Sequence, residues 1–412
     1  IPSKALVEQA ELMRSIPELE KLGIKVDLSG LNYEKAYEES RKAAAALSKG
    51  VSYLLKKNGV AVVKGTAVFN TANELVVDNN QVIKAKSIII ATGSSPKEIP
   101  VFKFDNKLIL SSTDILFLKE LPKSILILGA GAIGVEFAHI LNAFGVEVYL
   151  VEMMDRILPV EDHEVSEQLL RSFKKRKLNV YTSTKITGVT KGENSIDVEM
   201  ESVNGTQSLT VDKMLVVAGR TPNTSGIGLE KIGVKTERGF VVVNDNCETS
   251  VSGVYAIGDI VNTPLLAHVA SKEGEIAAEH IAGLEPKKLN RKCIPAAVYC
   301  EPQVASFGLT ESEAKEKGLE YKVSKFPYKG IGKAVAVGKS EGFVKLITNS
   351  SGTILGGHIF GSEASDLIHE MMLGTCAGFT PMVIAEMIHA HPTLSEGIME
   401  AARLSLNKAI HI

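Results

Sequence analysis

The run Gly129-Ala130-Gly131-Ala132-Ile133-Gly134 has the GxGxxG spacing of a phosphate-binding loop. It follows the apolar stretch 124–128, and residues 135–144 after it have the spacing of a helix. In such a loop the first glycine makes a tight turn, the second lets the backbone approach a pyrophosphate, and the third packs helix on strand. The helix N-terminus adds free amides and a positive dipole. This context favours a dinucleotide site over a glycine-rich turn without a ligand.

Glu152 stands where a dinucleotide-binding unit places its acidic residue, about 20 positions after the loop and at the end of a second strand, 147–151. A carboxylate there accepts hydrogen bonds from both hydroxyls of the adenosine ribose and repels a 2′-phosphate. The sequence therefore predicts NAD(H) and not NADP(H). Arg156 is the one nearby feature that favours a phosphate, and a single arginine beyond an acid is a weak indication.

The third group is His389-Ala390-His391-Pro392-Thr393-Leu394-Ser395-Glu396. Pro392 cannot continue a helix, so His391 is expected at a break where its ring is held in one direction. Glu396, near the start of the next helix, can accept from one ring nitrogen and raise the basicity of the other, as in a general base. An ordinary structural role remains the expectation for three further histidines, His358, His369 and His389.

A Gly-Asp pair ends another short apolar strand, 254–257, and places Asp259 where a carboxylate can meet sugar-like hydroxyls at a sheet edge. Taken alone, Gly-Asp after a strand is usually a turn. The same caution applies to Ala91-Thr92-Gly93, which follows strand 88–90, and to 218–223, which follows strand 215–217.

The elements that position these groups follow from hydrophobic periodicity. The predicted helices are 1–57, 135–144, 265–281, 364–376, 381–390 and 395–406. The predicted strands are 60–63, 68–69, 75–77, 87–90, 124–128, 147–151, 180–181, 196–200, 214–217, 254–257, 297–299, 304–307 and 343–347. Strand, loop, helix and strand over 124–151 form a βαβ unit with a parallel sheet, whereas the strands after residue 290 alternate like an antiparallel sheet.

Composition excludes several classes of protein. The 412 residues carry 46 Lys+Arg and 48 Asp+Glu, a net charge of −2, so no basic excess points to nucleic acid. No apolar run approaches the ~20 residues of a membrane span, and no secretory segment is evident. A cytoplasmic location is expected, with an organelle matrix after removal of an import segment as the alternative. Four cysteines, whose spacing fits no metal site, are expected to be free thiols in a reducing compartment.

These motifs, in this order over the whole chain, resemble the pyridine nucleotide–disulfide oxidoreductases, and most closely the dihydrolipoamide dehydrogenases among them. The most specific points of resemblance are 1–6, 129–136, 218–223, 256–259 and 391–396. The resemblance implies an α/β FAD/NAD-linked reductase fold, with two Rossmann-like nucleotide-binding domains and an α+β C-terminal interface domain. The implied domains are an FAD-binding domain (1–115 and 245–290), an NAD-binding domain (116–244) and an interface, or dimerisation, domain (291–412).

The resemblance also assigns roles to individual residues. Lys4 and Glu136 would form an ion pair near the reactive edge of the flavin. His391 would take a proton from a dihydrolipoamide thiol, with Glu396 orienting it. The residues implied to bind FAD are Lys4, Ala67, Thr92, Gly93, Ser94, Asp259, Leu265, Leu266, Ala267 and His268. The residues implied to bind NAD are Gly129, Gly131, Gly134, Glu152, Ile186 and Gly219. Further implied cofactor-binding residues are Ala130, Ala132, Ile133, Val135, Glu136 and Arg220.

The implied activity is oxidation of protein-bound dihydrolipoamide by NAD+ through an active-site disulfide and FAD. The implied assembly is a homodimer in which His391 reaches the flavin site of the other subunit. The implied partner is the lipoyl domain, or E2 core, of a 2-oxo-acid dehydrogenase complex. No nucleic acid, membrane or metal is expected.

One departure from the family keeps alternatives open. In the family a first GxGxxG unit for FAD and a CxxxxC redox pair precede Ile1, and no pair among the four cysteines here has that spacing. The sequence as given is therefore expected to be N-terminally truncated and inactive in disulfide chemistry. The alternatives are a non-catalytic nucleotide-binding and dimerisation fragment, or a soluble pyridine nucleotide transhydrogenase, which lacks the disulfide. Glu152 argues against glutathione reductases, and the C-terminus lacks the cysteine pair of mercuric reductases.

Overall fold

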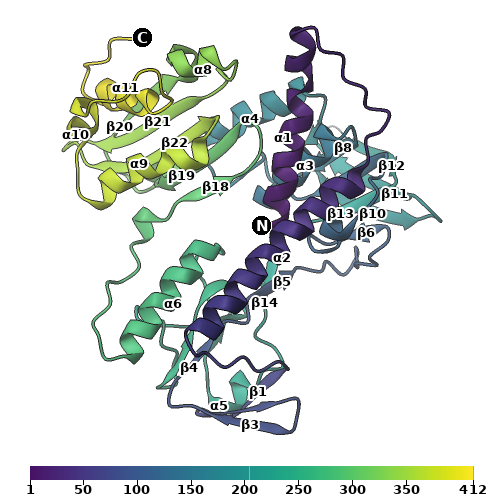
Figure 1. Cartoon of the computed structure of the whole chain (residues 1–412), viewed down its shortest axis with the longest axis vertical. Coiled ribbons are helices and arrows are strands. Elements are labelled where there is room, and N and C mark those ends of the chain that lie inside the picture. Colours follow the sequence, from purple (N-terminus) through teal and green to yellow (C-terminus); the bar gives the residue numbers. More distant parts are fainter. Residues whose placement is uncertain (204, 412) are drawn as a thin grey trace. The chain divides into compact units, whose positions relative to one another are not determined.

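The computed structural model of this protein describes residues 1–203 and 205–411 (Figure 1). The chain divides into two compact units, each assembled from segments distant in sequence. Unit 1 contains Ile1–Leu47, Glu98–Ala218 and Arg291–Ile412, and unit 2 contains Ser48–Lys97 and Gly219–Asn290. The three-domain division expected from the sequence remains a prediction.

A five-stranded parallel sheet in unit 1 carries the glycine-rich loop. In spatial order its strands are β6 (Ile109–Leu110), β13 (Lys213–Val216), β7 (Ser124–Leu128), β8 (Glu147–Val151) and β9 (Asn179–Tyr181). The helix α3 (Ala132–Ala143) connects β7 to β8, which confirms the predicted βαβ unit. Ile125, Ile127 and Leu150 are fully buried, as expected in a parallel sheet that is covered on both faces.

The same part of unit 1 also contains a three-stranded antiparallel sheet, one α-helix and one 3-10 helix. The antiparallel sheet is formed by β10 (Lys185–Lys191), β11 (Ile196–Ser202) and β12 (Gly205–Val211). The helices are α4 (His163–Lys175) and the 3-10 helix η1 (Asp114–Phe117). Asp162 is the N-cap of α4, where its side chain accepts a hydrogen bond from the Glu164 amide.

The C-terminal part of unit 1 is a five-stranded antiparallel sheet with helices, as the alternation of apolar residues predicts. Its strands in spatial order are β18 (Ala296–Val298), β19 (Gln303–Gly308), β22 (Ile354–Gly361), β21 (Phe343–Asn349) and β20 (Tyr321–Pro327). Its helices are α7 (Glu311–Glu316), α8 (Gly332–Ala336), α9 (Ala364–Cys376), α10 (Pro381–Glu386), α11 (Glu396–Ser405), and the 3-10 helices η3 (Arg291–Cys293) and η4 (Tyr328–Gly330). Helix α9 packs on β19 and β22, so one face of the sheet forms a hydrophobic core with it.

Two helices form most of the N-terminal stretch that was predicted to be helical throughout. Helix α1 (Pro2–Lys21) packs against α3, and its residues Leu6, Val7 and Ala10 join the core of the parallel sheet. Helix α2 (Tyr33–Lys57) follows after residues 22–32, which are not helical. The helix prediction is therefore confirmed except at that break.

The strands of unit 2 are short, between two and five residues each. The sheet β1 (Ala67–Thr71), β2 (Glu74–Val77), β3 (Gln81–Lys84) is antiparallel. The paired strands are β4 (Ile88–Ile90) with β17 (Val254–Ala256), β5 (Ser94–Pro96) with β14 (Arg220–Pro222), and β15 (Thr236–Glu237) with β16 (Phe240–Val241). The helices are α5 (Leu229–Ile232), α6 (Ala267–Ile281) and the 3-10 helix η2 (Gly258–Ile260).

Two secondary-structure predictions are wrong. Residues 60–63 are not a strand, because no strand of the described chain pairs with them and Val60, Val62 and Val63 are exposed. The helix predicted over 381–390 ends at Glu386, where the chain turns extended at Met387. It therefore ends well before Pro392, and the backbone at Met387, not the proline, terminates it.

The free-thiol prediction holds for only part of the cysteines. Cys247 and Cys300 are free and buried. Cys293 and Cys376 form a disulfide, with their Cα atoms 6.1 Å apart, which corrects the expectation for these two residues. Sequence spacing gave no sign of this pair, because η3 and the end of α9 meet only through the packing of α9 on the sheet.

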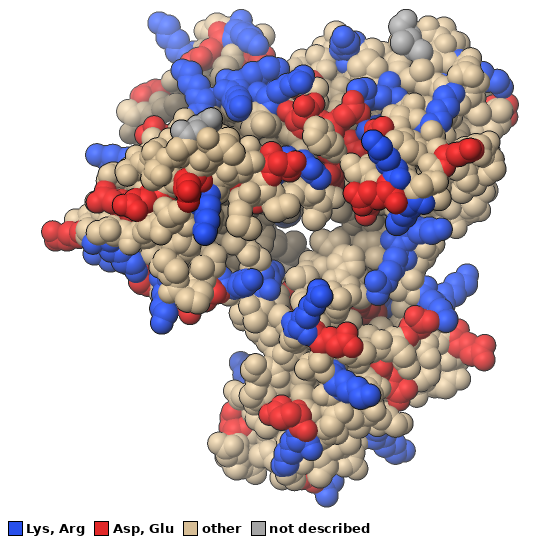
Figure 2. Space-filling view, turned by 180° about the vertical axis from the view of Figure 1, so that it is seen from behind, with Lys and Arg blue, Asp and Glu red and all other residues tan. Residues whose placement is uncertain are grey.

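The charged side chains do not gather into a patch of one sign on the face drawn in Figure 2, where acidic and basic groups are interspersed. This pattern agrees with the nearly balanced composition. Each helix in the described part of the chain is too short or too polar to cross a lipid bilayer.

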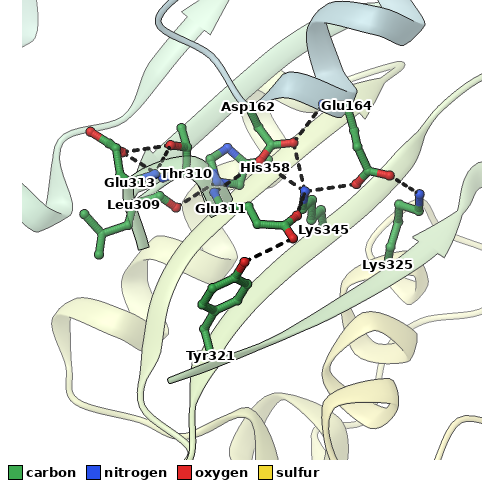
Figure 3. Close-up of polar contacts among 10 residues, drawn as sticks. All are labelled: Asp162, Glu164, Leu309, Thr310, Glu311, Glu313, Tyr321, Lys325, Lys345 and His358. Carbon is green, nitrogen blue, oxygen red and sulfur yellow. Dashed lines mark hydrogen bonds and ion pairs between the residues drawn. The ribbon is translucent and has the colours of Figure 1, made fainter. Parts of the chain in front are cut away.

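One buried lysine links the C-terminal sheet of unit 1 to the start of α4 (Figure 3). Lys345 on β21 and Asp162 at the start of α4 are each 1% exposed, and Lys345 Nζ lies 2.9 Å from Asp162 Oδ1. The same ammonium lies 2.9 Å from Glu164 Oε2 and 2.7 Å from Glu311 Oε2. A buried charge is tolerated only when it is paired, so these contacts fix α4 against β21.

Replacing the lysine should therefore cost stability. We expect Lys345→Ala to lower the free energy of unfolding by about 3–5 kcal/mol, because it leaves the buried Asp162 carboxylate without its cation. The control is Lys325→Ala, since Lys325 pairs with Glu164 at the surface and should contribute less than about 1 kcal/mol. Urea unfolding followed by circular dichroism measures both, and equal effects of the two substitutions would contradict a special role for Lys345.

The same cluster predicts a pH dependence. Burial raises the pKa of the Asp162 carboxyl, but the charge of His358 and the hydrogen bond and charge of Lys345 outweigh it and hold the pKa below 3.8. A carboxyl whose pKa is lower in the folded state stabilises the fold above its unfolded pKa, and this contribution is lost as the pH falls below it. The difference in melting temperature between wild type and Lys345→Ala should thus shrink between pH 5 and pH 3, as scanning calorimetry can measure.

Candidate active site

The glycine-rich loop between β7 and α3 has the geometry of a pyrophosphate cradle. Gly129 has φ +107°, and a Cβ there would meet the Val217 carbonyl oxygen at 2.8 Å. A Cβ on Gly134 would lie 1.9 Å from the Gly129 carbonyl oxygen, whereas one on Gly131 would meet nothing within 4 Å. The first and third glycines are therefore required by packing, and Gly131 opens the loop to a ligand at the N-terminus of α3.

Glu152 follows β8 and lies beside this loop. Its Oε2 accepts a hydrogen bond of 2.7 Å from the Ala130 amide, and its Oε1 accepts one of 2.9 Å from the Met154 amide. The carboxylate is thus held in place and keeps lone pairs for ribose hydroxyls. Arg156 instead bonds to its own segment, through the Pro159 carbonyl and the Asp155 carboxylate, which removes the argument for a bound 2′-phosphate.

The loop residues therefore fit a dinucleotide of the NAD type. The loop supplies an open backbone at Gly131, helix α3 begins there without a side-chain cap, and Glu152 supplies a fixed acceptor. Ala132 is exposed and Ile133 half-buried, whereas Ala130 and Val135 are buried in the core. Ile186 on β10 is also buried among apolar side chains, so its predicted contact with NAD remains a prediction.

The predicted ion pair between Lys4 and Glu136 is present. Lys4 Nζ on α1 lies 2.6 Å from both carboxylate oxygens of Glu136 on α3. The Tyr299 amide donates to Glu136 Oε1 at 3.1 Å, and Lys4 Nζ lies 4.2 Å from the centre of the Tyr299 ring, a cation–π contact. Burial and the Glu136 carboxylate raise the pKa of the Tyr299 phenol. Tyr299 was missed from the sequence, where no motif marks it.

In unit 2 the strands β5 and β14 bring together three residues that were predicted to bind cofactors, Ser94, Asp259 and Arg220. Ser94 Oγ donates to Asp259 Oδ2 at 2.5 Å. Arg220 Nε donates to Ser94 Oγ at 2.6 Å, and Arg220 Nη2 donates to the Ser94 carbonyl at 2.6 Å. Asp259 is partly exposed and ordered by this contact, which fits a carboxylate that accepts from hydroxyls of FAD.

Thr92 and Gly93 are held by a residue that the sequence had not marked as a site residue. Thr92 Oγ1 donates to the Asn223 carbonyl at 2.8 Å, and Asn223 Nδ2 donates back to the Thr92 carbonyl at 2.9 Å. The Asn223 amide also bonds the Gly93 carbonyl. The loops 91–93 and 218–223 are therefore joined by hydrogen bonds, which neither sequence motif indicates by itself.

The remaining residues predicted for FAD lie at exposed positions of unit 2. Ala67 begins β1, and Leu265, Ala267 and His268 are exposed around the start of α6. Leu266 is the N-cap of α6. Their roles, like that of Gly219 before β14, remain predictions.

His391 and Glu396 form the predicted pair. His391 Nδ1 lies 2.9 Å from Glu396 Oε1, and the Thr393 amide donates to Glu396 Oε2 at 2.9 Å. Burial raises the pKa of the Glu396 carboxyl, but the hydrogen bonds from His391 and Thr393 outweigh it and hold the pKa below its ordinary value. The ring of His391 is 77% exposed, so its other nitrogen, Nε2, faces outward.

The structure thus forms four separate groups from the predicted site residues. They are the loop with Glu152, the pair Lys4 and Glu136, the pair His391 and Glu396, and the group around Asp259. Within the described residues no hydrogen bond joins the His391 pair to the Lys4 pair. The chemistry available to His391 is proton transfer at Nε2 with Glu396 stabilising the charged ring.

Two family models match this chain. One is described as pyridine nucleotide-disulphide oxidoreductase and matches residues 1–274, and the other is the dimerisation domain of the same family and matches residues 294–402. The dihydrolipoyl dehydrogenase of Bacillus subtilis (strain 168) is 40% identical over 426 residues, which cover 100% of this chain and 90% of that protein. The dihydrolipoyl dehydrogenase of Chlorobaculum tepidum is 42% identical over 409 residues, covering 98% of this chain and 87% of that protein.

Solved structures agree with these relatives. LpdA from Mycobacterium tuberculosis has a TM-score of 0.89 at 27% identity and covers 98% of this chain and 89% of its own. The HOCl-induced flavoprotein disulfide reductase RclA from Escherichia coli has a TM-score of 0.86 at 25% identity, covering 98% of this chain and 89% of its own. The predicted α/β reductase fold, with its C-terminal dimerisation domain, is confirmed.

Glu152 offers a direct test of the nucleotide site. We expect Glu152→Ala to raise KM for NAD+ about tenfold, because a hydrogen bond to a charged group contributes about 1.5–3 kcal/mol, and to weaken the preference for NAD+ over NADP+. Glu147→Ala serves as the control, because Glu147 is an exposed carboxylate at the start of β8 that accepts a hydrogen bond from the Tyr149 hydroxyl. Initial rates with both nucleotides check this, and an unchanged KM would contradict the role of Glu152.

Proposed function

The chain belongs to the pyridine nucleotide-disulphide oxidoreductase family, and from that membership we propose that it oxidises protein-bound dihydrolipoamide with NAD+. As a member of that family it is an oxidoreductase that uses FAD and NAD. The observation that carries the proposed substrate is the exposed His391 ring held by Glu396, because a dithiol substrate has to lose a proton before it can react as a thiolate.

His391 accepts the proton that the thiol of the substrate loses. Its Nδ1 hydrogen faces the Glu396 carboxylate, which fixes the tautomer and leaves the lone pair on Nε2. Nε2 takes the proton from one thiol of dihydrolipoamide, and Glu396 stabilises the imidazolium that results. The Thr393 amide prevents the Glu396 carboxylate from rotating away, since it binds the second oxygen.

FAD, when bound, would supply the two-electron chemistry that connects the dithiol with NAD+. Lys4, Glu136 and Tyr299 would hold a fixed charge arrangement beside that cofactor, and Ser94 with Asp259 would bind its hydroxyls. The loop at Gly131 and the carboxylate of Glu152 would bind NAD.

Residues 294–402 are a dimerisation domain of the family. The proposed assembly is a homodimer in which His391 serves the flavin site of the other subunit, in line with the outward direction of its ring. The proposed partner is the lipoyl domain of a 2-oxo-acid dehydrogenase complex. The cytoplasmic location remains a prediction.

The proposed function predicts different effects on two reactions of the purified full-length holoenzyme, in which the CxxxxC redox pair of the family is present. His391→Gln should lower kcat for dihydrolipoamide oxidation by about 10²–10⁴, because it removes the general base. It should leave NADH oxidation by ferricyanide within about twofold of wild type, since that reaction deprotonates no thiol.

The control is His369→Gln, because His369 is an exposed histidine of the same domain that bonds only to the Asp366 carbonyl. Absorbance at the NADH band follows both reactions. Unchanged dithiol turnover in His391→Gln would refute the assigned base, and a wild-type protein that does not oxidise dihydrolipoamide would refute the substrate.

A further inference from the structure

A second histidine–carboxylate pair lies two residues before His391, and no part of the proposed reaction uses it. His389 Nε2 lies 2.8 Å from Glu370 Oε1 on α9, and His389 Nδ1 lies 3.1 Å from the Met387 carbonyl. The side chain of His389 is 3% exposed, in contrast to 77% for His391. The His389 ring is therefore buried, whereas the His391 ring is open to solvent.

Both ring nitrogens of His389 face acceptors. A carbonyl oxygen only accepts, so the contact with Met387 places a hydrogen on Nδ1, and Nε2 lies within hydrogen-bond distance of the Glu370 carboxyl group. The charged groups around this segment are Asp366 and Glu370 on α9, Glu363 just before α9, Glu386 at the end of α10, Glu396 and Arg403 on α11, and Lys333 on α8. The ring is consequently held at both nitrogens, by its own segment on one side and by α9 on the other.

Residues 387–392, the segment that carries His391, have few other contacts that fix their position. Residues 387–392 form no helix or strand, and within this range His389 alone is not exposed. Ile388 is 96% exposed. A cleft of about 560 Å³ lies between α9 and residues 392–395, with Glu370 in its wall, so apolar packing does not support the segment on that side.

We propose that His389 and Glu370 form the anchor that positions His391, so that His389 is a positioning residue for proton transfer. The anchor joins the segment to α9, and the pair Glu396–Thr393 joins its other end to α11. The direction of Nε2 of His391 depends on both ends being fixed. This inference rests on the proposed function of His391.

The anchor also acts on the charge at Glu396. That carboxylate interacts favourably with His389 as well as with His391. Replacement of the His389 ring therefore changes the electrostatic environment of the His391 pair, and the pH profile of the reaction reports this change. A residue that only supports the fold would leave that profile in place.

The test uses the purified holoenzyme with three substitutions at the anchor, His389→Leu, His389→Gln and Glu370→Leu, and with the double variant His389→Leu/Glu370→Leu. His369→Leu is the matched control, because His369 is an exposed histidine on α9 beside Glu370. The readouts are kcat for dihydrolipoamide oxidation from pH 6 to pH 9, NADH oxidation by ferricyanide, and the melting temperature.

We expect His389→Leu to lower kcat with dihydrolipoamide by about 10–100-fold, because small misplacements of a base have effects of that size, and to shift the pH profile. Ferricyanide reduction should stay within twofold of wild type. His389→Gln should recover much of the loss, since its amide can still donate to Glu370. The double variant should be no worse than either leucine variant, because both remove one interaction.

Two results would overturn the proposal. One is a His389→Leu enzyme whose dithiol kcat and pH profile match those of wild type. The other is an equal loss of both activities with a lower melting temperature and no recovery in His389→Gln, which indicates a structural role. If wild type itself fails to oxidise dihydrolipoamide, the proposed function fails, and that outcome is distinct from these two.

Discussion

The hydrogen bond from the Ala130 amide to Glu152 shows the kind of contact on which the candidate sites depend, a carboxylate supplied by one element that fixes a donor on another. Glu136 on α3 holds Lys4 of α1 in the same way. A flexible donor in water has many positions, and a charge-assisted hydrogen bond to an ordered carboxylate selects one of them. Catalysis and cofactor binding both need that fixed geometry.

Carboxylates also fix a donor in the interior of the fold, where the cost of removing the charges from water is larger. Lys345 is fully buried and is stabilised by Asp162, Glu164 and Glu311, which belong to elements distant from β21 in sequence. Removing charges from water is costly, so such a cluster contributes orientation more than net stability. The cluster fixes α4, which follows β8 in the chain, against the C-terminal antiparallel sheet of unit 1.

The histidine segment combines these features at one place. His391 is exposed and free to meet a substrate, whereas His389 is buried and bound to α9. Irregular backbone can present a reactive side chain only if rigid neighbours hold it. The two carboxylates, Glu370 and Glu396, come from helices on either side of the segment and supply that support.

The sequence by itself determined the local features of this protein. The GxGxxG loop, the βαβ unit around it and the pair His391–Glu396 could be predicted because their residues lie close along the chain and period and spacing report local geometry. Only the tertiary structure decided the long-range contacts, such as Tyr299 beside Lys4, the disulfide Cys293–Cys376 and the link from His389 to Glu370. These depend on which helix packs on which sheet, and a single sequence carries no periodic signal for a contact between side chains that are distant along the chain.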